Sequence, residues 1–426
     1  MMRSHTQEHP CSSLATTTAR SALAIGALLI ATGCSSPESG TEVAEPETPS
    51  GDQAIIEELA ARAGATGGES VLFWSSDERR VAFRNTAQIN PTRTVTAGSS
   101  PFPLEEAKRD LSSLTYSVED ESYTVGDYLS MPESMSVIVV KNGKVLFEEY
   151  TGGNDDASRW ISFSVTKSVT SMLIGAAVAD GYIRSVSEPV VTYLPHLEGT
   201  AYEGATVEDV LHMASGVAWN EDYADPESDV ANAGGANGIV LQKYLAELGK
   251  ENEPGEEFNY NTGETNLAGE ILRSAIGNNA ATYLTTKIWQ PFGMESDADW
   301  VLGGLGGGEL GGCCIAATLR DYARLGLFAM NDGVLPDGTR VLPEGWMAQS
   351  TEPSQGFEGY GYLWWLSGDG SYSARGIFGQ MIFVDPANEL VIAMHNLADE
   401  ATGSDFAQHS AAVTGALRQA AIEAGP

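Results

Sequence analysis

The chain has 426 residues and a formal net charge of −35 at pH 7, because 58 acidic residues outnumber 23 lysines and arginines. A chain this acidic is not expected to bind nucleic acid, whose phosphates attract positive charge. The six histidines show no metal-ligand spacing, so we expect neither a metal ion nor another cofactor. The length is sufficient for two domains or for one large domain with two lobes.

Residues 1–33 predict a signal peptide. Their apolar run from Ser21 to Thr32 is too short for a permanent membrane anchor. The run ends in Ala31-Thr-Gly-Cys34, which resembles a bacterial lipoprotein cleavage site, where the cysteine becomes lipidated. We therefore expect an exported protein that a lipid on Cys34 anchors to the bacterial cell envelope, at the outer membrane or the periplasmic face. An ordinary secretory signal, cleaved near the same place, is the alternative.

Three further regions follow the signal peptide. Residues 34–53 are rich in Ser, Pro, Glu, Thr and Gly, which predicts a disordered linker. Residues 54–132 are interpreted as an N-terminal extension of residues 133–426, the main domain. Besides Cys11 and Cys34, the only cysteines are Cys313 and Cys314. Neighbouring cysteines pair only with strained geometry, so we expect no disulfide here.

The main domain begins with two predicted strands in residues 135–150, joined at Asn142-Gly143, because Asn-Gly between β-rich runs is a strong hairpin signal. Ser164 and Lys167 then open a helix that runs to Asp180. Residues three positions apart share one face of a helix, so an amine lies beside a hydroxyl, as activation of a serine nucleophile requires. The alternative interpretation is that Ser164 only caps the helix.

Helices dominate the middle of the chain and strands the end. Residues of about 190–300 predict an inserted all-α lobe, which includes helices at 207–213, 238–248, 263–276 and 281–289. A helix at 317–329 follows. Predicted strands at 361–366, 371–378, 381–384 and 390–394 precede a helix at 407–424. This order predicts an α/β (α+β) fold whose antiparallel sheet combines N-terminal and C-terminal strands, with a site between the sheet and the lobe.

S-x-x-K, here Ser164 to Lys167, is a signature of serine β-lactamases and penicillin-binding proteins. The stretch from Phe258 to Gly269 is similar to the Y-x-N region of class C β-lactamases and penicillin-binding esterases. This resemblance implies that Tyr260 acts with Lys167 as general base, and that the neighbouring ammonium lowers the pKa of the phenol. Thr262 stands where that family usually has Asn, at a position that contacts substrate.

The stretch Gly376–Pro386 resembles the strand pair that follows the K-T-G motif of class C enzymes. Counting back aligns Ser371–Ala374 with K-T-G-x. The resemblance implies an oxyanion hole made by the backbone N–H groups of Ser164 and Ala374, and substrate contacts from Tyr372 and Ser373. The lysine of K-T-G is absent, so we do not expect efficient β-lactamase activity.

Across roughly residues 130–420 the chain most resembles the 6-aminohexanoate-dimer hydrolase branch of the β-lactamase-related serine hydrolases. The stretches that carry this resemblance are Arg159–Lys167, Val217–Asp229 and Ser373–Gln380. It implies a β-lactamase/transpeptidase-like fold, and a substrate contact from Tyr223 on the loop after the nucleophile helix.

The sequence therefore predicts a serine hydrolase that cleaves a small ester or amide through an acyl-enzyme, with Ser164, Lys167 and Tyr260 as catalytic residues. A DD-peptidase-like enzyme is one alternative. The other is a non-catalytic lipoprotein that keeps this fold and binds a cell-envelope ligand.

Overall fold

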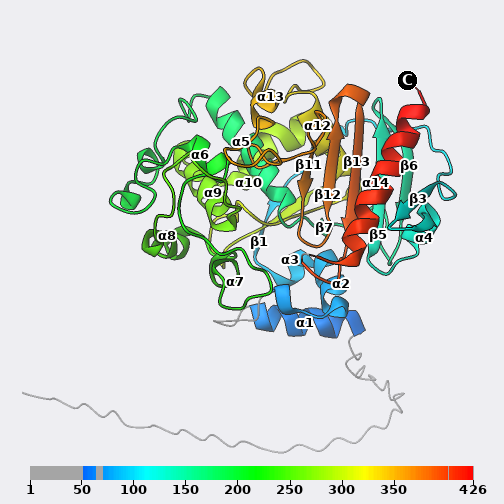
Figure 1. Cartoon of the computed structure of the whole chain (residues 1–426), viewed down its shortest axis with the longest axis horizontal. Helices are drawn as coiled ribbons and strands as arrows, with labels where there is room; N and C mark the ends of the chain where they lie inside the picture. The colour runs from blue at the N-terminus through cyan, green and yellow to red at the C-terminus, as the bar shows by residue number, and fades with distance from the viewer. Residues whose placement is uncertain (1–50, 64–70, 402, 426) are drawn as a thin grey trace, which may run out of the picture. The chain divides into compact units, whose positions relative to one another are not determined.

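The computed structural model describes residues 51–63, 71–401 and 403–425 (Figure 1). The predicted signal peptide and Cys34 lie outside these residues, as does most of the predicted linker. Helix α1 (Gly51–Ala63) begins within the last three residues of that linker. None of the helices in the described ranges is long and apolar enough to cross a membrane.

Seven strands form the main sheet, and the predicted pairing of N-terminal with C-terminal strands is confirmed by the β5–β13 ladder. All neighbouring strands are antiparallel except β2 and β6, which are parallel. The strands, in spatial order, are β10 (Trp365–Leu366), β11 (Tyr372–Arg375), β12 (Met381–Asp385), β13 (Leu390–Asn396), β5 (Ser134–Lys141), β6 (Lys144–Tyr150) and β2 (Glu105–Glu106).

The hairpin β5–β6 turns at Asn142 and Gly143, as predicted, and both residues have positive φ angles of 51° and 73°. Strand β5 is buried on both faces. Ile138 and Val140 pack into one hydrophobic core, while Val137 and Val139 pack into a second core on the opposite face. Burial on both faces explains why this strand is continuously apolar instead of alternating.

Helices cover both faces of the sheet (Figure 1). On one face lie α5 (Val165–Ala179) and α12 (Leu319–Met330), and on the other lies α14 (Asp405–Glu423). The predicted helical lobe is present beside the first face. Its helices are α6 (Val207–Leu211), α7 (Asp229–Ala233), α8 (Gly238–Glu247), α9 (Thr262–Ile276), α10 (Ala280–Leu284) and α11 (Gln290–Phe292), with a π-helical turn at Thr285–Trp289 between the last two.

A second sheet was not predicted. Its four strands are β1 (Thr92–Val95), β8 (Ala298–Val301), β9 (Ile315–Ala317) and β7 (Trp160–Ile161), in that spatial order. These strands have two to four residues and are mostly buried, so they give no alternating pattern. The remaining α-helices and strands are α2 (Ser76–Arg84), α3 (Thr86–Ile89), the hairpin β3 (Thr115–Val118) and β4 (Glu121–Thr124), α4 (Val125–Leu129) and α13 (Trp346–Ser350).

Two predicted strands are shorter than expected. The segment 361–366 pairs only at Trp365 and Leu366, since the chain turns at Leu363, whose φ is 60°. The segment 371–378 pairs only from Tyr372 to Arg375, because residues 376–380 form the turn into β12. The sheet edge beside the helical lobe is therefore a very short strand.

Helix α12 packs closely on the sheet at Gly326. A Cβ atom at this position would lie 2.6 Å from Val391 Cγ1 and 2.8 Å from Ile382 Cγ2. By contrast, a Cβ atom on Gly415 in α14 would meet nothing within 4 Å.

We predict that Gly326→Ala destabilises the protein by about 1–3 kcal/mol, because overpacking of the core outweighs the better helix propensity of alanine. Gly415→Ala, the matched control, is expected to stabilise it by up to about 1 kcal/mol. Reversible denaturant unfolding of both variants measures the difference. Equal stabilities would contradict the close approach of α12 to the sheet.

Candidate active site

Ser164 begins helix α5 directly after a strained turn. Strand β7 ends at Ile161, and Phe163 adopts a positive φ of 45°, which is rare for a residue with a side chain. Its ring packs against Phe83 and Phe378, with centroids 4.9 and 5.0 Å away, and these contacts hold the turn. The hydroxyl of Ser164 makes no capping hydrogen bond to the helix, so the interpretation of Ser164 as a simple cap is wrong.

Tyr260 lies immediately before α9, which packs against α5. Asn261 caps α9 through its side chain, which accepts a hydrogen bond from Glu264 N, and so fixes the start of the helix. The side chain of Ser164 lies close enough to the Tyr260 phenol to influence its pKa. Lys167 Nζ lies 5.4 Å from the centroid of the same ring. The fold thus brings together the three predicted catalytic residues.

The Lys167 side chain is almost completely buried, with 1% of its surface exposed. Its amine donates hydrogen bonds to Thr262 Oγ1 at 2.9 Å and to the carbonyl of Gly312 at 3.2 Å. Burial lowers the pKa of Lys167 to about 8, although the negative charge of Glu221 acts in the opposite direction. A large fraction of this amine is therefore unprotonated in mildly alkaline solution.

The pKa of Tyr260 does not follow the prediction. Burial and the nearby Glu221 carboxylate raise it well above its ordinary value, and the Ser164 hydroxyl only partly opposes them. The expected lowering by Lys167 is absent because a lysine with a depressed pKa carries less positive charge. Tyr260 is thus a neutral phenol, and Lys167 is the stronger candidate for the base.

Glu221 is the site residue that the sequence analysis missed. Its carboxylate accepts hydrogen bonds from Tyr223 Oη at 2.7 Å, from Thr262 N at 3.0 Å, and from Thr262 Oγ1 and Trp219 Nε1. A chain of hydrogen bonds therefore runs from Lys167 through the Thr262 hydroxyl to Glu221. Tyr223 and Thr262, predicted to contact substrate, are also the residues that hold this carboxylate.

The predicted oxyanion donor at Ala374 is wrong. Two hydrogen bonds at the ends of β11 show which way its backbone groups point. The N–H of Gly376 donates to the carbonyl of Gln380, on the side of β12, and the carbonyl of Ser371 accepts from the N–H of Ser367, on the side of β10. Antiparallel ladders alternate, so the N–H of Ala374 faces β12, to which this residue pairs, while the N–H of Arg375 faces the other side. Strand β10 pairs with β11 only at Trp365, opposite Ser373, and at Leu366, opposite Tyr372. The N–H of Arg375 therefore lies beyond the end of this ladder.

The side chains of Tyr372 and Ser373 do not fit their predicted substrate contacts. Tyr372 is buried in the core of the sheet, where its ring packs against Trp364 with centroids 5.1 Å apart. Ser373 is fully buried and accepts a hydrogen bond from Arg375 Nε at 2.8 Å. Side chains alternate along a strand, so Arg375 shares the face of Ser373 and lines a groove beside the site.

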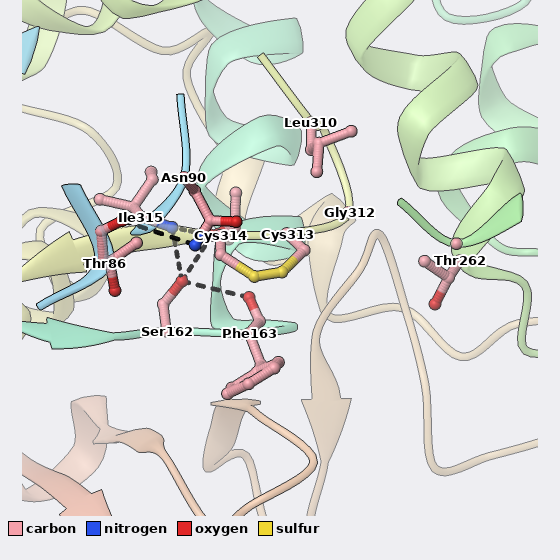
Figure 2. The surroundings of a disulfide bond; sticks show 12 residues. Thr86, Asn90, Ser162, Phe163, Thr262, Leu310, Gly312, Cys313, Cys314 and Ile315 are labelled. Atoms are coloured by element: carbon pink, nitrogen blue, oxygen red, sulfur yellow. Dashed lines mark hydrogen bonds between the residues drawn. A yellow bond between two sulfur atoms is a disulfide. The ribbon is translucent and has the colours of Figure 1, made fainter. Parts of the chain in front are cut away.

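Cys313 and Cys314 are joined by a disulfide, so the expectation of unpaired cysteines is wrong (Figure 2). The bond lies in the segment between Gly312, which accepts from Lys167, and Ile315, whose N–H donates to Ser162 Oγ at 2.8 Å and to Thr166 Oγ1 at 2.9 Å. The segment is therefore fastened on both sides of the disulfide to the start of α5.

Gly312 has a steric role in this arrangement. A Cβ atom there would lie 3.1 Å from Lys167 Nζ and 3.1 Å from the Thr262 carbonyl oxygen. Glycine thus lets the backbone approach the buried amine. No group of three or more His, Cys, Asp or Glu residues that could hold a metal ion occurs in the described part of the chain.

We predict that Glu221→Gln lowers the pKa of Lys167 below about 8, because the mutation removes the negative charge that favours the ammonium. Titration of the lysine side-chain NMR signals measures this shift. The chain has seven lysines, and the spectrum of Lys167→Met identifies the relevant signal. Glu227→Gln, an exposed carboxylate on the same loop, should leave the titration unchanged. A pKa that does not fall in Glu221→Gln would contradict the electrostatic role of Glu221.

Comparison with known proteins gives three findings. The sequence profile of the family described as Beta-lactamase matches residues 131–413. The chain is 29% identical over 355 residues to the 6-aminohexanoate-dimer hydrolase of Paenarthrobacter ureafaciens, an alignment that covers 77% of this chain and 88% of that protein. Solved structures with the same fold include one named "Putative 6-aminohexanoate-dimer hydrolase from Bacillus anthracis", with 20% identity and a TM-score of 0.72, covering 83% of this chain and 98% of that one.

A family VIII carboxylesterase also shares the fold, with 17% identity and a TM-score of 0.54, over 70% of this chain and 96% of that one. The predicted β-lactamase/transpeptidase-like fold is therefore confirmed.

Proposed function

Since the chain belongs to the beta-lactamase family of serine hydrolases, we propose that it cleaves an ester or amide bond of a small substrate through an acyl-enzyme on Ser164. The observation that carries this proposal is the environment of the Ser164 hydroxyl. This hydroxyl is not used for capping, it lies near the phenol of Tyr260, and it is one helical turn from an amine of lowered pKa. Such a pairing of hydroxyl and amine activates a serine nucleophile.

In the proposed acylation step, Ser164 Oγ attacks the carbonyl carbon of the substrate and its proton passes to the neutral amine of Lys167. The bond to the leaving alcohol or amine then breaks, and the leaving group takes up this proton. In the second step water attacks the acyl carbon and gives a proton to the same amine. The ester bond to Ser164 then breaks, the acid is released, and the amine returns the proton to Ser164 Oγ.

Tyr260 keeps its proton in this proposal, because its pKa is raised. Its phenol can accept a proton from one partner while it gives its own to another. We therefore assign it the role of a relay between Ser164, Lys167 and the leaving group, in place of a phenolate base.

The oxyanion that forms in each step requires backbone donors. We assign this role to the N–H of Ser164, at the start of α5, and to the N–H of Arg375, which lies beyond the ladder of β10. The two relatives named for their activity, a dimer hydrolase and a carboxylesterase, support amide or ester substrates alike. Because the lysine of K-T-G is missing, we expect any β-lactamase activity to be weak.

We predict that Ser164→Ala reduces hydrolysis of a short-chain nitrophenyl ester by at least about 10³-fold, since the nucleophile is removed. Ser171→Ala is the matched control, because Ser171 is buried on the same helix and its hydroxyl has no hydrogen-bond partner among the described residues. A fluorophosphonate probe, read by intact mass, should label the wild type and not Ser164→Ala. Equal labelling of the two would refute the acyl-enzyme, and labelling of neither, with saturable ligand binding, would indicate a non-catalytic binding protein.

We also predict that kcat/KM for a neutral ester rises with pH and levels off above about 8, because only the unprotonated amine of Lys167 can accept the proton. The pH range of 6 to 10 is measured at constant ionic strength, after confirming that the protein stays folded throughout. A profile that is flat across about pH 7–9 would exclude Lys167 as the base. In Glu221→Gln the rise should move to lower pH.

A further inference from the structure

We propose that the side chain of Arg375 binds a carboxylate on the substrate, so that the preferred substrates are anionic esters or amides. This inference rests on the proposed function and names the class of substrate for the same site. Three observations carry it: the guanidinium lies on the indole ring that stacks against Tyr260, it has no ion-pair partner among the described residues, and it opens into a groove.

The guanidinium is connected to Tyr260 through one aromatic ring. Trp365 stacks on Tyr260 with the ring centroids 5.5 Å apart and the planes at 25°. On the same indole, Arg375 Cζ lies 5.8 Å from the ring centroid. Because the N–H of Arg375 also faces the reacting carbonyl in our proposal, one residue would contribute a donor for the oxyanion and a cation for a second group on the substrate.

Arg375 has no carboxylate partner among the described residues. Its contacts are Ser373 Oγ, at 2.8 Å from Nε, and the face of Trp365. Desolvation lowers the pKa of the Arg375 guanidinium, and no described acidic side chain opposes this effect. The residue as a whole is nevertheless exposed, so its guanidinium is open to an anionic ligand and need not release another carboxylate to bind one.

Arg418, which lines the same groove, provides the contrast. Its guanidinium pairs with Asp385 Oδ2 at 2.7 Å and with Asp369 Oδ2 at 2.7 Å, so this arginine already has its partners. Glu400 also lines the groove but does not influence the charge of Arg375. Among the described residues of the groove, Arg375 is therefore the cation that is available to a ligand.

The groove itself fits a short apolar chain. It has a volume of about 530 Å³ and extends from Tyr223, Tyr260 and Trp365 across β11 and β12 to helix α14. Its walls include the apolar side chains of Ile377, Met381, Phe383 and Phe406. A few methylene groups between the scissile carbonyl and a carboxylate would lie against these side chains, while the carboxylate reaches the planar donor fork of Arg375.

Three nitrophenyl esters of nearly equal length test the proposal. They are 4-nitrophenyl hydrogen adipate, which is anionic, its neutral methyl ester, and 4-nitrophenyl 6-aminohexanoate, which is cationic. We expect kcat/KM of the wild type to be about tenfold or more higher for the anionic than for the neutral ester, chiefly through a lower KM, and lowest for the cationic ester.

Arg375→Gln keeps the backbone N–H and removes the charge, so the ratio of anionic to neutral kcat/KM should fall to about one. Arg375→Lys should give an intermediate ratio, because lysine keeps the charge without the planar fork. Arg184→Gln removes an equal charge from an exposed arginine on the helical-lobe side and should leave the ratio unchanged. Each variant is measured on both esters, so that a general loss of activity or folding cancels in the ratio.

A wild-type ratio of one or less, or a wild-type ratio that Arg375→Gln retains, would overturn the assignment of Arg375. Failure of the proposed function gives a different result, which is turnover of none of the three esters, or turnover that Ser164→Ala does not abolish.

Discussion

The site depends on an amine that is kept out of water. Lys167 is held between α5, the start of α9 and the backbone at Gly312, and it has two hydrogen-bond acceptors, Thr262 Oγ1 and the Gly312 carbonyl. Burial favours the unprotonated amine, while the carboxylate of Glu221, one hydrogen bond further away through Thr262, limits that effect. The pKa of the amine is therefore set jointly by the packing of three segments that are distant in sequence.

The parts of this arrangement that depend on local sequence could be predicted. The Asn142-Gly143 turn, the apolar stripe of α5 and the S-x-x-K spacing are local patterns, and the structure confirms the hairpin and the helix that they indicate. The family resemblance correctly predicted that Tyr260 lies near Ser164 in the folded protein. The fold class followed from the order of strands and helices, because strands from both ends of the main domain flank a helical middle region.

The remaining features arise from tertiary contacts that no local pattern reveals. Glu221 is one acidic residue among 58 in an acidic chain, so nothing in the sequence distinguishes its buried hydrogen bonds from a solvated charge. The raised pKa of Tyr260 results from burial by neighbouring rings. The error at Ala374 has a similar origin, because motif counting cannot determine which edge of β11 an amide faces. That direction depends on the register with β12, which is set by the turn at residues 376–380.

The brevity of β10 has a consequence for how this fold can vary. Inside a sheet each backbone amide already has an acceptor, so a strand interior cannot offer hydrogen bonds to a reacting molecule. Because β10 pairs over only two residues, the neighbouring strand keeps a donor free at its end. Insertions that prolong this edge strand towards Leu363 would saturate that donor while every catalytic side chain stayed in place. The length of this edge strand would then distinguish active from inactive proteins of such a fold. A comparison of catalytic residues alone would not reveal that difference.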